Sequence, residues 1–591
     1  MKCIPALTIL LALTTLTAPL AAKPAPLEPS PFGIDALKPR FGKDMPNIWK
    51  IEDELANYLV DAGLRWDRAS IDWSDVQTAK DGPFDWTFTD QMVKVYSERP
   101  ISGYCLLMGR GQWLTAEPHT EEERAEFANY VYEVVSRYKD TFKVWEIWNE
   151  PNIPSFWKVP SAEDYTSLLK AAYAAAKKAD PGCVVIAGGT STVDIGWVRK
   201  VLFANGGWDY CDAVAIHPYS MGGSPASQGL GELIRMTRAA ATKSGVSKPV
   251  WITEVGYTTN TEPDNELRQA ENLVQEYVIA LSEGVRKTFW FTLGDWSERW
   301  GIIAGKNNQP DWGFTSTKRP KPAFYAAKHL IEALSPSGLR PSYLGYLPDT
   351  GKVSAIAFLA DGDPKKPVLV VWAPFGEQDS LELPRGAPLH ALNAHGKTVP
   401  IEDYVLRVTE VPVIITGFKP GALKGASPKN DVSLRKPGVN LLINPSMELP
   451  DGDTVSFWGQ GRFPDQSKDG VMEWADEGRT GKHALRIGAS KDAAWNNVPI
   501  PVWDGKTYTL HAWVKPSEAT GANTISIEWY SGNMWTWLGR TESESVTGSG
   551  GWREITVNGK APADAVVARV TISGKNTTGS VLWDDVTFSE G

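Results

Sequence analysis

The sequence predicts an α/β protein: a (β/α)8 TIM barrel, followed by a small β-sandwich and a C-terminal β-sandwich of jelly-roll type. Short β-branched or aromatic runs alternate with amphipathic segments from Phe32 to about Leu334, which is typical of βα units around a parallel sheet. Beyond Ser335 the pattern changes to strands alone. The 591-residue chain also exceeds one hydrophobic core, since single cores stop growing near roughly 250–300 residues.

Eight short segments of the first part have the composition of β-strands. They are residues 32–35, 64–70, 101–108, 143–149, 184–189, 213–219, 249–257 and 288–293. Their number and spacing fit a barrel with modest insertions, since such barrels usually take about 250 residues. A doubly wound open sheet is the alternative, but no glycine-rich phosphate loop follows the first strand, so a dinucleotide site has no support.

Three segments between these strands have the pattern of amphipathic helices. Residues 120–140 carry apolar side chains at helical spacing, with acidic residues leading and basic residues trailing. Residues 161–182 begin with a serine suited to cap a helix and end at Pro-Gly. Residues 265–284 predict a third helix before the last strand. The alternation of helix and strand therefore continues along the whole barrel.

The rest of the chain divides by composition. Residues 335–418 predict the small β-sandwich, and residues 419–439 are rich in proline, glycine, serine and lysine, as linkers are. Residues 440–591 are all-β again, with turn signals at short intervals. We therefore expect a catalytic barrel over 32–334 and a separate C-terminal module.

The first 22 residues resemble a cleaved secretory signal, with Lys2, an apolar run and small residues before the proline-rich stretch. This predicts a secreted, periplasmic or extracellular protein. No other segment approaches the length of a membrane span. Cleavage would leave Cys105, Cys183 and Cys211, for which buried thiols are favoured over a Cys183–Cys211 disulfide.

Charge and aromatic content restrict the partners. The formal charge of -10 repels phosphate backbones, so nucleic acid is excluded as an expected partner. The chain has 26 tryptophans, and flat indole faces stack on the C–H faces of sugar rings, although more than half should be plain core. These features favour a polysaccharide or oligosaccharide as the ligand.

Two glutamates follow predicted barrel strands at positions suited to glycoside hydrolysis. Glu150 follows the fourth strand and Glu254 lies at the end of the seventh. Cleaving a glycosidic bond requires one carboxylic acid to protonate the leaving oxygen and one carboxylate to meet the anomeric carbon from the opposite face. Carboxyl ends of barrel strands converge on one mouth, where barrel enzymes hold their active sites. The sequence thus predicts that both side chains face one cleft.

The segments around these glutamates, WNEPN (148–152) and ITEVGY (252–257), resemble the two signatures of glycoside hydrolase clan A, closest to its family 39-like members. The resemblance covers the barrel, roughly half of the chain. It implies a retaining glycosidase in which Glu150 is the acid/base and Glu254 the nucleophile. Retention predicts carboxyl groups about 5–5.5 Å apart, against roughly 6.5–9.5 Å for inversion.

Three further motifs extend the resemblance: WDRASIDW, HPY and FWFTL. The substrate-binding residues that they and WNEPN imply are Arg68, Asn149, His217, Tyr219 and Trp290. The arginine and the tyrosine are expected beside the nucleophile, the histidine beside the acid/base or the sugar, and the asparagine at the sugar 2-hydroxyl. Trp290 is expected to form the platform under the bound sugar. One departure is that GYCLLMGRGQW (103–113) lacks the histidine with which many relatives end strand three.

Taken singly, each motif has a structural explanation. An NEP tripeptide can be the first turn of a helix, since asparagine caps helices and proline favours their first turn. His217 alone would more often be a structural histidine, and Trp290 alone barrel core. The motifs together, in barrel order, favour catalysis. With seven histidines, no HExxH spacing and no GxSxG elbow, we expect no cofactor for catalysis.

The C-terminal segments NLLINPSMELPDGD (440–453) and VLWDDVTF (581–588) resemble the first and last strands of jelly-roll carbohydrate-binding modules. In such modules a structural calcium often joins these strands, and the resemblance makes Glu448 and Asp585 the candidate ligands. A surface carboxylate pair is the alternative. Some of Trp495, Trp529, Trp535 and Trp537 should line a sugar-binding face, whereas Trp513 and Trp583 should be core.

The sequence therefore predicts a secreted retaining glycosidase that cleaves a β-linked polysaccharide or oligosaccharide, with a module that holds substrate nearby. A polysaccharide-binding protein whose barrel has lost its catalytic activity is one alternative. A transglycosylase that uses the same residues is another. The sequence leaves open the sugar, the linkage and the choice between endo and exo action.

Overall fold

The computed structural model of the chain describes residues 28–36, 48–219, 223–259, 265–295, 299–304, 319–428, 438–451, 454–461, 469–532 and 536–591. The predicted signal sequence and residues 429–437 of the predicted linker lie outside these ranges.

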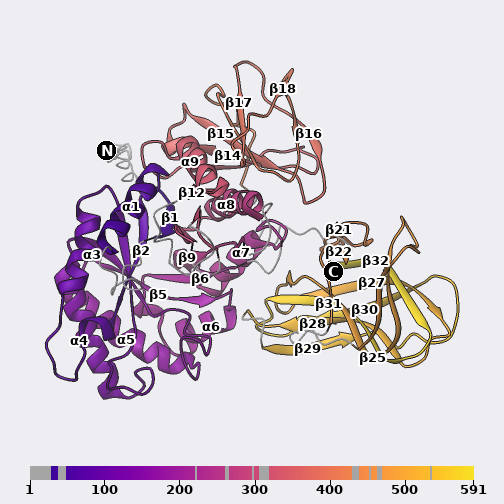
Figure 1. Ribbon diagram of the computed structural model, residues 1–591, viewed down its shortest axis with the longest axis horizontal. Coiled ribbons are helices and arrows are strands. Elements are labelled where there is room, and N and C mark those ends of the chain that lie inside the picture. Colours follow the sequence, from indigo (N-terminus) through magenta and orange to yellow (C-terminus); the bar gives the residue numbers. More distant parts are fainter. Residues whose placement is uncertain are drawn as a thin grey trace, which may run out of the picture.

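The first part of the chain is a closed barrel of eight parallel strands, as predicted (Figure 1). The strands are β1 (Phe32–Asp35), β2 (Trp66–Asp72), β3 (Ser102–Met108), β4 (Phe142–Ile147), β5 (Val184–Ser191), β6 (Ala213–His217), β9 (Val250–Val255) and β10 (Thr288–Phe291). They are hydrogen-bonded in the order β1-β10-β9-β6-β5-β4-β3-β2. Each strand overlaps one of the eight segments expected from composition. All carboxyl ends therefore meet at one mouth.

Side chains alternate between the barrel interior and the outer shell. Tyr104, Trp251 and Phe289 pack against one another inside, with ring centroids 4.6–6.2 Å apart. Because successive strand residues point to opposite faces, their neighbours face the surrounding helices. The barrel is thus a filled core that leaves only its ends for chemistry.

Helices surround the barrel. They are α1 (Ile48–Asp61), α2 (Trp73–Val76), α3 (Thr87–Ser97), α4 (Glu121–Tyr138), α5 (Ala162–Ala179), α6 (Ile195–Arg199), α7 (Leu230–Ala240), α8 (Asn265–Ser282) and α9 (Pro322–Leu334). The three predicted helices correspond to α4, α5 and α8. Thr120 caps α4 in a capping box with Glu123, and the Ser161 side chain caps α5. These caps satisfy first-turn N–H groups and explain why both helices begin there.

Two short antiparallel strand pairs and two short helical segments complete this part as far as it is described. The pairs are β7 (Thr242–Lys243) with β8 (Val246–Ser247) and β11 (Ile303–Ala304) with β12 (Arg319–Pro320). A π-helical turn over Lys200–Ala204 and a 3-10 turn over Trp208–Tyr210 follow α6.

Next comes a sandwich of two antiparallel sheets. The larger sheet has the order β13 (Ser342–Tyr346), β14 (Ser354–Leu359), β15 (Pro367–Trp372), β20 (Val413–Thr416), β17 (His390–Asn393). The smaller has the order β16 (Asp379–Glu382), β19 (Val405–Val408), β18 (Ile401–Glu402). Ala355 and Ala357 face the core between the sheets, whereas Ile356 and Phe358 join the core shared with the barrel. One face of the larger sheet therefore packs against the smaller sheet and the other packs against the barrel.

The C-terminal module is antiparallel. Its main sheet has the order β29 (Trp537–Glu542), β28 (Ala522–Tyr530), β31 (Val567–Thr577), β25 (Ala484–Asn497), β32 (Ser580–Glu590), β27 (Thr507–Ser517), β30 (Arg553–Lys560). The shorter strands are β21 (Pro450–Asp451), β22 (Thr454–Val455), β23 (Trp458–Gln460), β24 (Asp469–Ala475) and β26 (Ile500–Pro501). One end of β25 pairs with β32 and the other with β31, so this long strand takes part in two layers of the β-structure.

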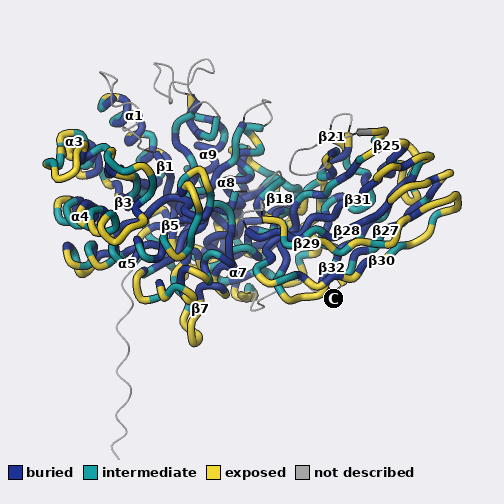
Figure 2. The backbone as a smooth tube through the Cα atoms, turned by 90° about the horizontal axis from the view of Figure 1, so that it is seen from below, coloured by how far each residue is buried: buried dark blue, intermediate teal, exposed yellow. Residues whose placement is uncertain are grey.

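The C-terminal module is docked on the barrel, whereas the sequence suggested a domain held through a linker. Arg199, the last residue of α6, lies 2.6 Å from Asp504 and 3.1 Å from Asp564 of the module. Tyr530, Val566 and Val567 of the module belong to the barrel's own hydrophobic core, and Figure 2 shows buried backbone in the strands on both sides of this contact. A contact with shared apolar burial holds two domains in one orientation.

In the part of the chain that is described, no helix combines the length and the apolarity needed to cross a membrane. Cys105, Cys183 and Cys211 are free buried thiols, as favoured from the sequence.

Candidate active site

The loop after β4 carries Glu150 in a strained backbone conformation. Trp148 and Glu150 have φ angles of 69° and 41°, in the left-handed region that non-glycine residues rarely adopt. The Glu150 N–H donates to the carbonyl of Gly189 at 2.9 Å, and Asn152 accepts from the N–H of Ser191 at 2.9 Å. The carboxyl end of β5 thus holds the WNEPN segment in place, and strain of this kind is often stored at functional sites.

His217 at the end of β6 connects Glu150 to the interior of the barrel. Its Nδ1 lies 2.9 Å from Glu150 Oε1, and its Nε2 lies 3.0 Å from Thr253 Oγ1. The Thr253 hydroxyl donates to the Glu146 carboxylate at 2.9 Å, so its oxygen is left to accept from His217 Nε2–H. The Nε2 position is therefore protonated, and Nδ1 and Glu150 are placed to share one further proton.

The surroundings of His217 favour this extra proton. The side chain is fully buried, which by itself lowers the pKa of an imidazole. The negative charge of Glu254 and the hydrogen bond and charge of Glu150 outweigh that effect, and the pKa of His217 is raised above its ordinary value of 6.5.

Glu254, near the end of β9, is held from two sides. Arg68 Nη1 donates to its Oε2 at 2.7 Å, and the Tyr219 hydroxyl donates to its Oε1 at 2.6 Å. Burial and the nearby Glu254 charge raise the pKa of Tyr219 well above the usual range, so the phenol stays a donor. Both contacts stabilise a charged, oriented Glu254 carboxylate.

Arg68 is the centre of the charge network under the mouth. Its guanidinium also donates to Glu146 at 2.9 Å and to the Asn149 side-chain oxygen at 2.9 Å, and it lies 3.8 Å from Asp35. Burial disfavours its charge, but the surrounding acidic groups raise the pKa of Arg68 well above its ordinary value. Because the Asn149 oxygen is engaged, its amide nitrogen remains as the donor on that side chain.

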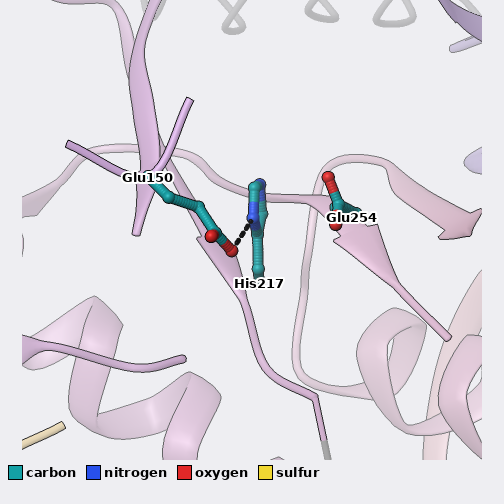
Figure 3. A group of neighbouring side chains, drawn as sticks. All are labelled: Glu150, His217 and Glu254. Atoms are coloured by element: carbon teal, nitrogen blue, oxygen red, sulfur yellow. Dashed lines mark hydrogen bonds and ion pairs between the residues drawn. The ribbon is translucent and has the colours of Figure 1, made fainter. Parts of the chain in front are cut away.

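The two carboxylates lie on either side of His217, as Figure 3 shows. A carboxylate oxygen of Glu150, one of Glu254 and a ring nitrogen of His217 all lie within 4.8 Å of one another. Within the described ranges this is the only group of three or more acidic, histidine or cysteine side chains close enough to hold a metal ion. The Arg68 guanidinium is already paired with Glu254, so the donor set suits proton transfer better than cation binding.

The comparisons with known proteins concern the barrel that carries this site. Residues 125–318 match the family model described as "Glycosyl hydrolase catalytic core". The barrel is that of a glycosidase. No curated protein matches the sequence.

Solved structures share the fold of this glycosidase. A family 39 glycoside hydrolase from the gut symbiont Bacteroides cellulosilyticus WH2 is 20% identical with a TM-score of 0.52, over 66% of this chain and 81% of that one. SrfJ from Salmonella typhimurium is 10% identical with a TM-score of 0.50, over 66% of this chain and 90% of that one. The resemblance to a clan A, family 39-like barrel is thereby confirmed at the level of fold.

One predicted sugar contact of the glycosidase is wrong. Trp290 is 1% exposed and belongs to the core between barrel and helices, so it cannot lie under a sugar at the mouth. Along β10 the inward positions are those of Phe289, which packs inside the barrel, and Phe291, which pairs in register with Asp35. The error arises because adjacent strand residues point to opposite faces.

The aromatic side chains at the mouth are therefore different ones. Trp300 lies with its ring centroid 5.4 Å from that of Tyr219 and 6.0 Å from that of Phe291. Sequence reasoning missed Phe291 because it read the strand-eight motif one residue out of register. It had no signal for Trp300, which lies in a loop.

The polar interior was also missed. Glu146, Tyr104 and Thr253 are buried and form the layer beneath the catalytic pair, with the Tyr104 hydroxyl 3.3 Å from the Glu146 carboxylate. A signal was present, since Glu146 is a charged residue inside a strand, four positions before Glu150. A buried carboxylate needs partners, and Arg68 supplies them.

The predicted calcium ligands both accept hydrogen bonds from the turn over residues 479–483 of the module and do not fit a cation site. Glu448 Oε1 accepts backbone N–H bonds from Lys482 and His483 at 2.9 and 2.8 Å. Asp585 accepts from the Arg479 guanidinium and the Thr480 hydroxyl, both at 2.5 Å. One oxygen of Glu448 and both oxygens of Asp585 thus accept from donors of the chain, and the positive charge of Arg479 beside Asp585 opposes a divalent cation.

The tryptophans of the module divide differently from the expectation. Trp495 and Trp529 are buried in its core with Trp583. The Arg479 guanidinium stacks on Trp513, with Cζ 3.7 Å from the ring centroid. Trp537 is 57% exposed, and Trp535 lies outside the described residues.

Proposed function

We propose that this protein is a secreted, retaining glycoside hydrolase that cleaves β-glycosidic bonds of a polysaccharide or oligosaccharide. Glu254 is the nucleophile and Glu150 the acid/base in this proposal. The observation that carries it is the pair of carboxylates within 4.8 Å, one held by charged and phenolic donors and the other by a proton-sharing imidazole. Their separation supports double displacement over inversion.

The different partners of the two carboxylates support different protonation states. Arg68 and Tyr219 donate to Glu254 and keep it an unprotonated nucleophile. Nδ1 of His217 holds Glu150 and the extra proton together, so that proton is available at the leaving oxygen. Two adjacent carboxyl groups with opposite tasks are what acid and nucleophile assignments require.

The reaction then follows from the positions of the groups. Glu150 donates its proton to the glycosidic oxygen as the bond to the anomeric carbon breaks, while a Glu254 oxygen bonds to that carbon. Glu150, now a carboxylate, takes a proton from water, which attacks the same carbon and releases Glu254. Two inversions restore the starting configuration. The Asn149 amide is placed to donate to the sugar 2-hydroxyl through both steps.

The proposal extends to cofactors, export, the charge of the substrate and the division into domains. No cofactor is needed for these steps. The signal-like first 22 residues support export, and the net charge of -10 favours a neutral sugar polymer over nucleic acid. We propose the division into a barrel over 32–334, a sandwich that begins at residue 335 and a module over 440–591. Of the predicted linker over 419–439, residues 419–428 pack on the sandwich, where Leu423 is buried and Ser427 bridges to Tyr346.

The test is a substrate panel of xylan, β-glucan, mannan and aryl glycosides with wild type, Glu254→Gln and Glu150→Gln. We expect Glu254→Gln to lower kcat by at least about a thousandfold, and Glu150→Gln to lose about a hundredfold or more on poor leaving groups. Glu150→Gln should retain most of the first step on dinitrophenyl glycosides, because that leaving group needs no proton.

The anomer of the first product, followed by NMR, decides the stereochemistry. A retained anomer supports double displacement, whereas an inverted one contradicts it. Wild type that turns over none of the panel, and binds its members no better than Glu254→Gln does, would sink the hydrolase assignment.

A further inference from the structure

A turn of the C-terminal module reaches the mouth of the barrel. Gly532 lies between β28 and β29, and its carbonyl accepts a hydrogen bond from the Thr192 hydroxyl just after β5. A side chain at Gly532 would overlap the backbone of Val193, so only glycine allows this approach.

This contact lies close to the catalytic acid. Thr192 forms an isolated β-bridge with His217, and His217 Nδ1 lies 2.9 Å from Glu150. Only two residues therefore separate the module from the proposed acid/base.

The module also lies beside Tyr219, which donates a hydrogen bond to the nucleophile Glu254. A small cavity next to Tyr219 has walls from both domains, including Gln228 and Glu276 of the barrel with Pro501, Gly532 and Val567 of the module. The mouth is thus bounded on the side of β5 and β6 by the module.

Trp537 lies on the module next to this turn. It opens β29 and pairs in register with Tyr530, which packs into the barrel core. A register shift lies between this pair and that of Trp529 with Gly539, so Leu538 is the extra residue on β29. Trp537 stays opposite Tyr530, which places it on the face where Tyr530 meets the barrel. Trp537 is 57% exposed, and its partner Tyr530 is two residues before Gly532, which contacts Thr192 just after β5.

Polar side chains accompany this exposed indole. Glu528 and Arg540 are paired in register across β28 and β29, and the Tyr530 hydroxyl donates to Glu528 at 2.8 Å. An open aromatic face with hydrogen-bonding groups around it is the composition that recognises a sugar ring: stacking on the C–H face and polar contacts to the hydroxyls.

We propose that Gly532 and the paired strands β28 and β29 form a wall of the substrate cleft and that Trp537 binds a sugar residue of the same saccharide chain outside the catalytic pair. This inference rests on the proposed function and deepens it, since it makes the substrate a chain longer than the sugar held by Glu150 and Glu254. The module acts here as part of the active-site cleft and not as a remote anchor.

The test compares Trp537→Ala, Trp537→Phe and wild type on a polysaccharide and an aryl monoglycoside that wild type cleaves. We expect Trp537→Ala to raise KM on the polymer by about five- to tenfold, the usual size of an aromatic contact, with the aryl glycoside unchanged. Trp537→Phe should restore most of the loss. Tyr325→Ala is the control, since this 46% exposed aromatic lies on α9.

Each other outcome overturns the inference. Equal losses on polymer and aryl glycoside, with a lowered melting temperature, would mean that Trp537 only supports the fold. No loss on either would mean that the chain does not touch it. Cleavage of aryl glycosides but of no polymer would reject the extended cleft and leave the hydrolase standing, whereas failure of wild type on both removes the proposed function itself.

Discussion

At the scale of single residues, the site works because each carboxylate has its own set of partners. Glu254 accepts hydrogen bonds from Arg68 and Tyr219. The Glu150 side chain is hydrogen-bonded to the ring nitrogen of His217. Two carboxylates of the same chemistry thereby take opposite roles. The imidazole is a positioning residue, because it acts on the substrate through Glu150.

His217 is expected to make stability depend on pH. Its pKa is raised on folding, so the stabilisation is fully present below the unfolded value near 6.5 and is lost as pH rises through the folded value. Melting temperatures measured from about pH 6 to 9 should fall more steeply for wild type than for His217→Gln.

The same variant should change the basic limb of the kcat profile, because it removes His217, the group next to Glu150 whose raised pKa lies in this pH range. Parallel profiles for the two proteins, in stability and in kcat, would show that the ring carries no extra proton.

At the scale of the elements, the parity of a strand decides which side chains reach substrate. Phe289 and Phe291 of β10 face inward and Trp290 faces the helices, where it is 1% exposed. Substitution of the outward Trp290 should therefore lower stability, whereas substitution of the inward Phe291 should raise KM.

Trp290→Ala should lower the free energy of unfolding by about 3–5 kcal/mol, because it leaves a cavity in the shell, while KM stays close to that of wild type. Phe291→Ala should change stability less and raise KM more. Denaturant titration and steady-state kinetics on one aryl glycoside measure both. The reversed pattern would mean that the Trp290 ring does face the sugar.

At the scale of the whole molecule, barrel, sandwich and module share apolar burial. Ile356 and Phe358 of the sandwich and Val566 and Val567 of the module all belong to the core that includes the barrel. Parts that share one core are expected to unfold together.

Val566→Asp should therefore uncouple the module. An unpaired charge in this interface costs several kcal/mol, about 3–5 by analogy with broken buried pairs, so the single calorimetric transition of wild type should split or move down. Val246→Asp is the matched control, since Val246 is 66% exposed on β8. Two transitions already present in wild type would contradict the shared core.

The sequence by itself determined the barrel, its strands and the two glutamates, because hydrophobic periodicity and short motifs are local properties of the chain. Only the tertiary structure decided which side chains meet: the Glu146–Arg68 layer, the inward turn of Phe291 in place of Trp290, the arginine where calcium was expected, and Gly532 against the mouth. These depend on strand register and on contacts between residues hundreds of positions apart. The local sequence pattern determines neither the register nor these long-range contacts.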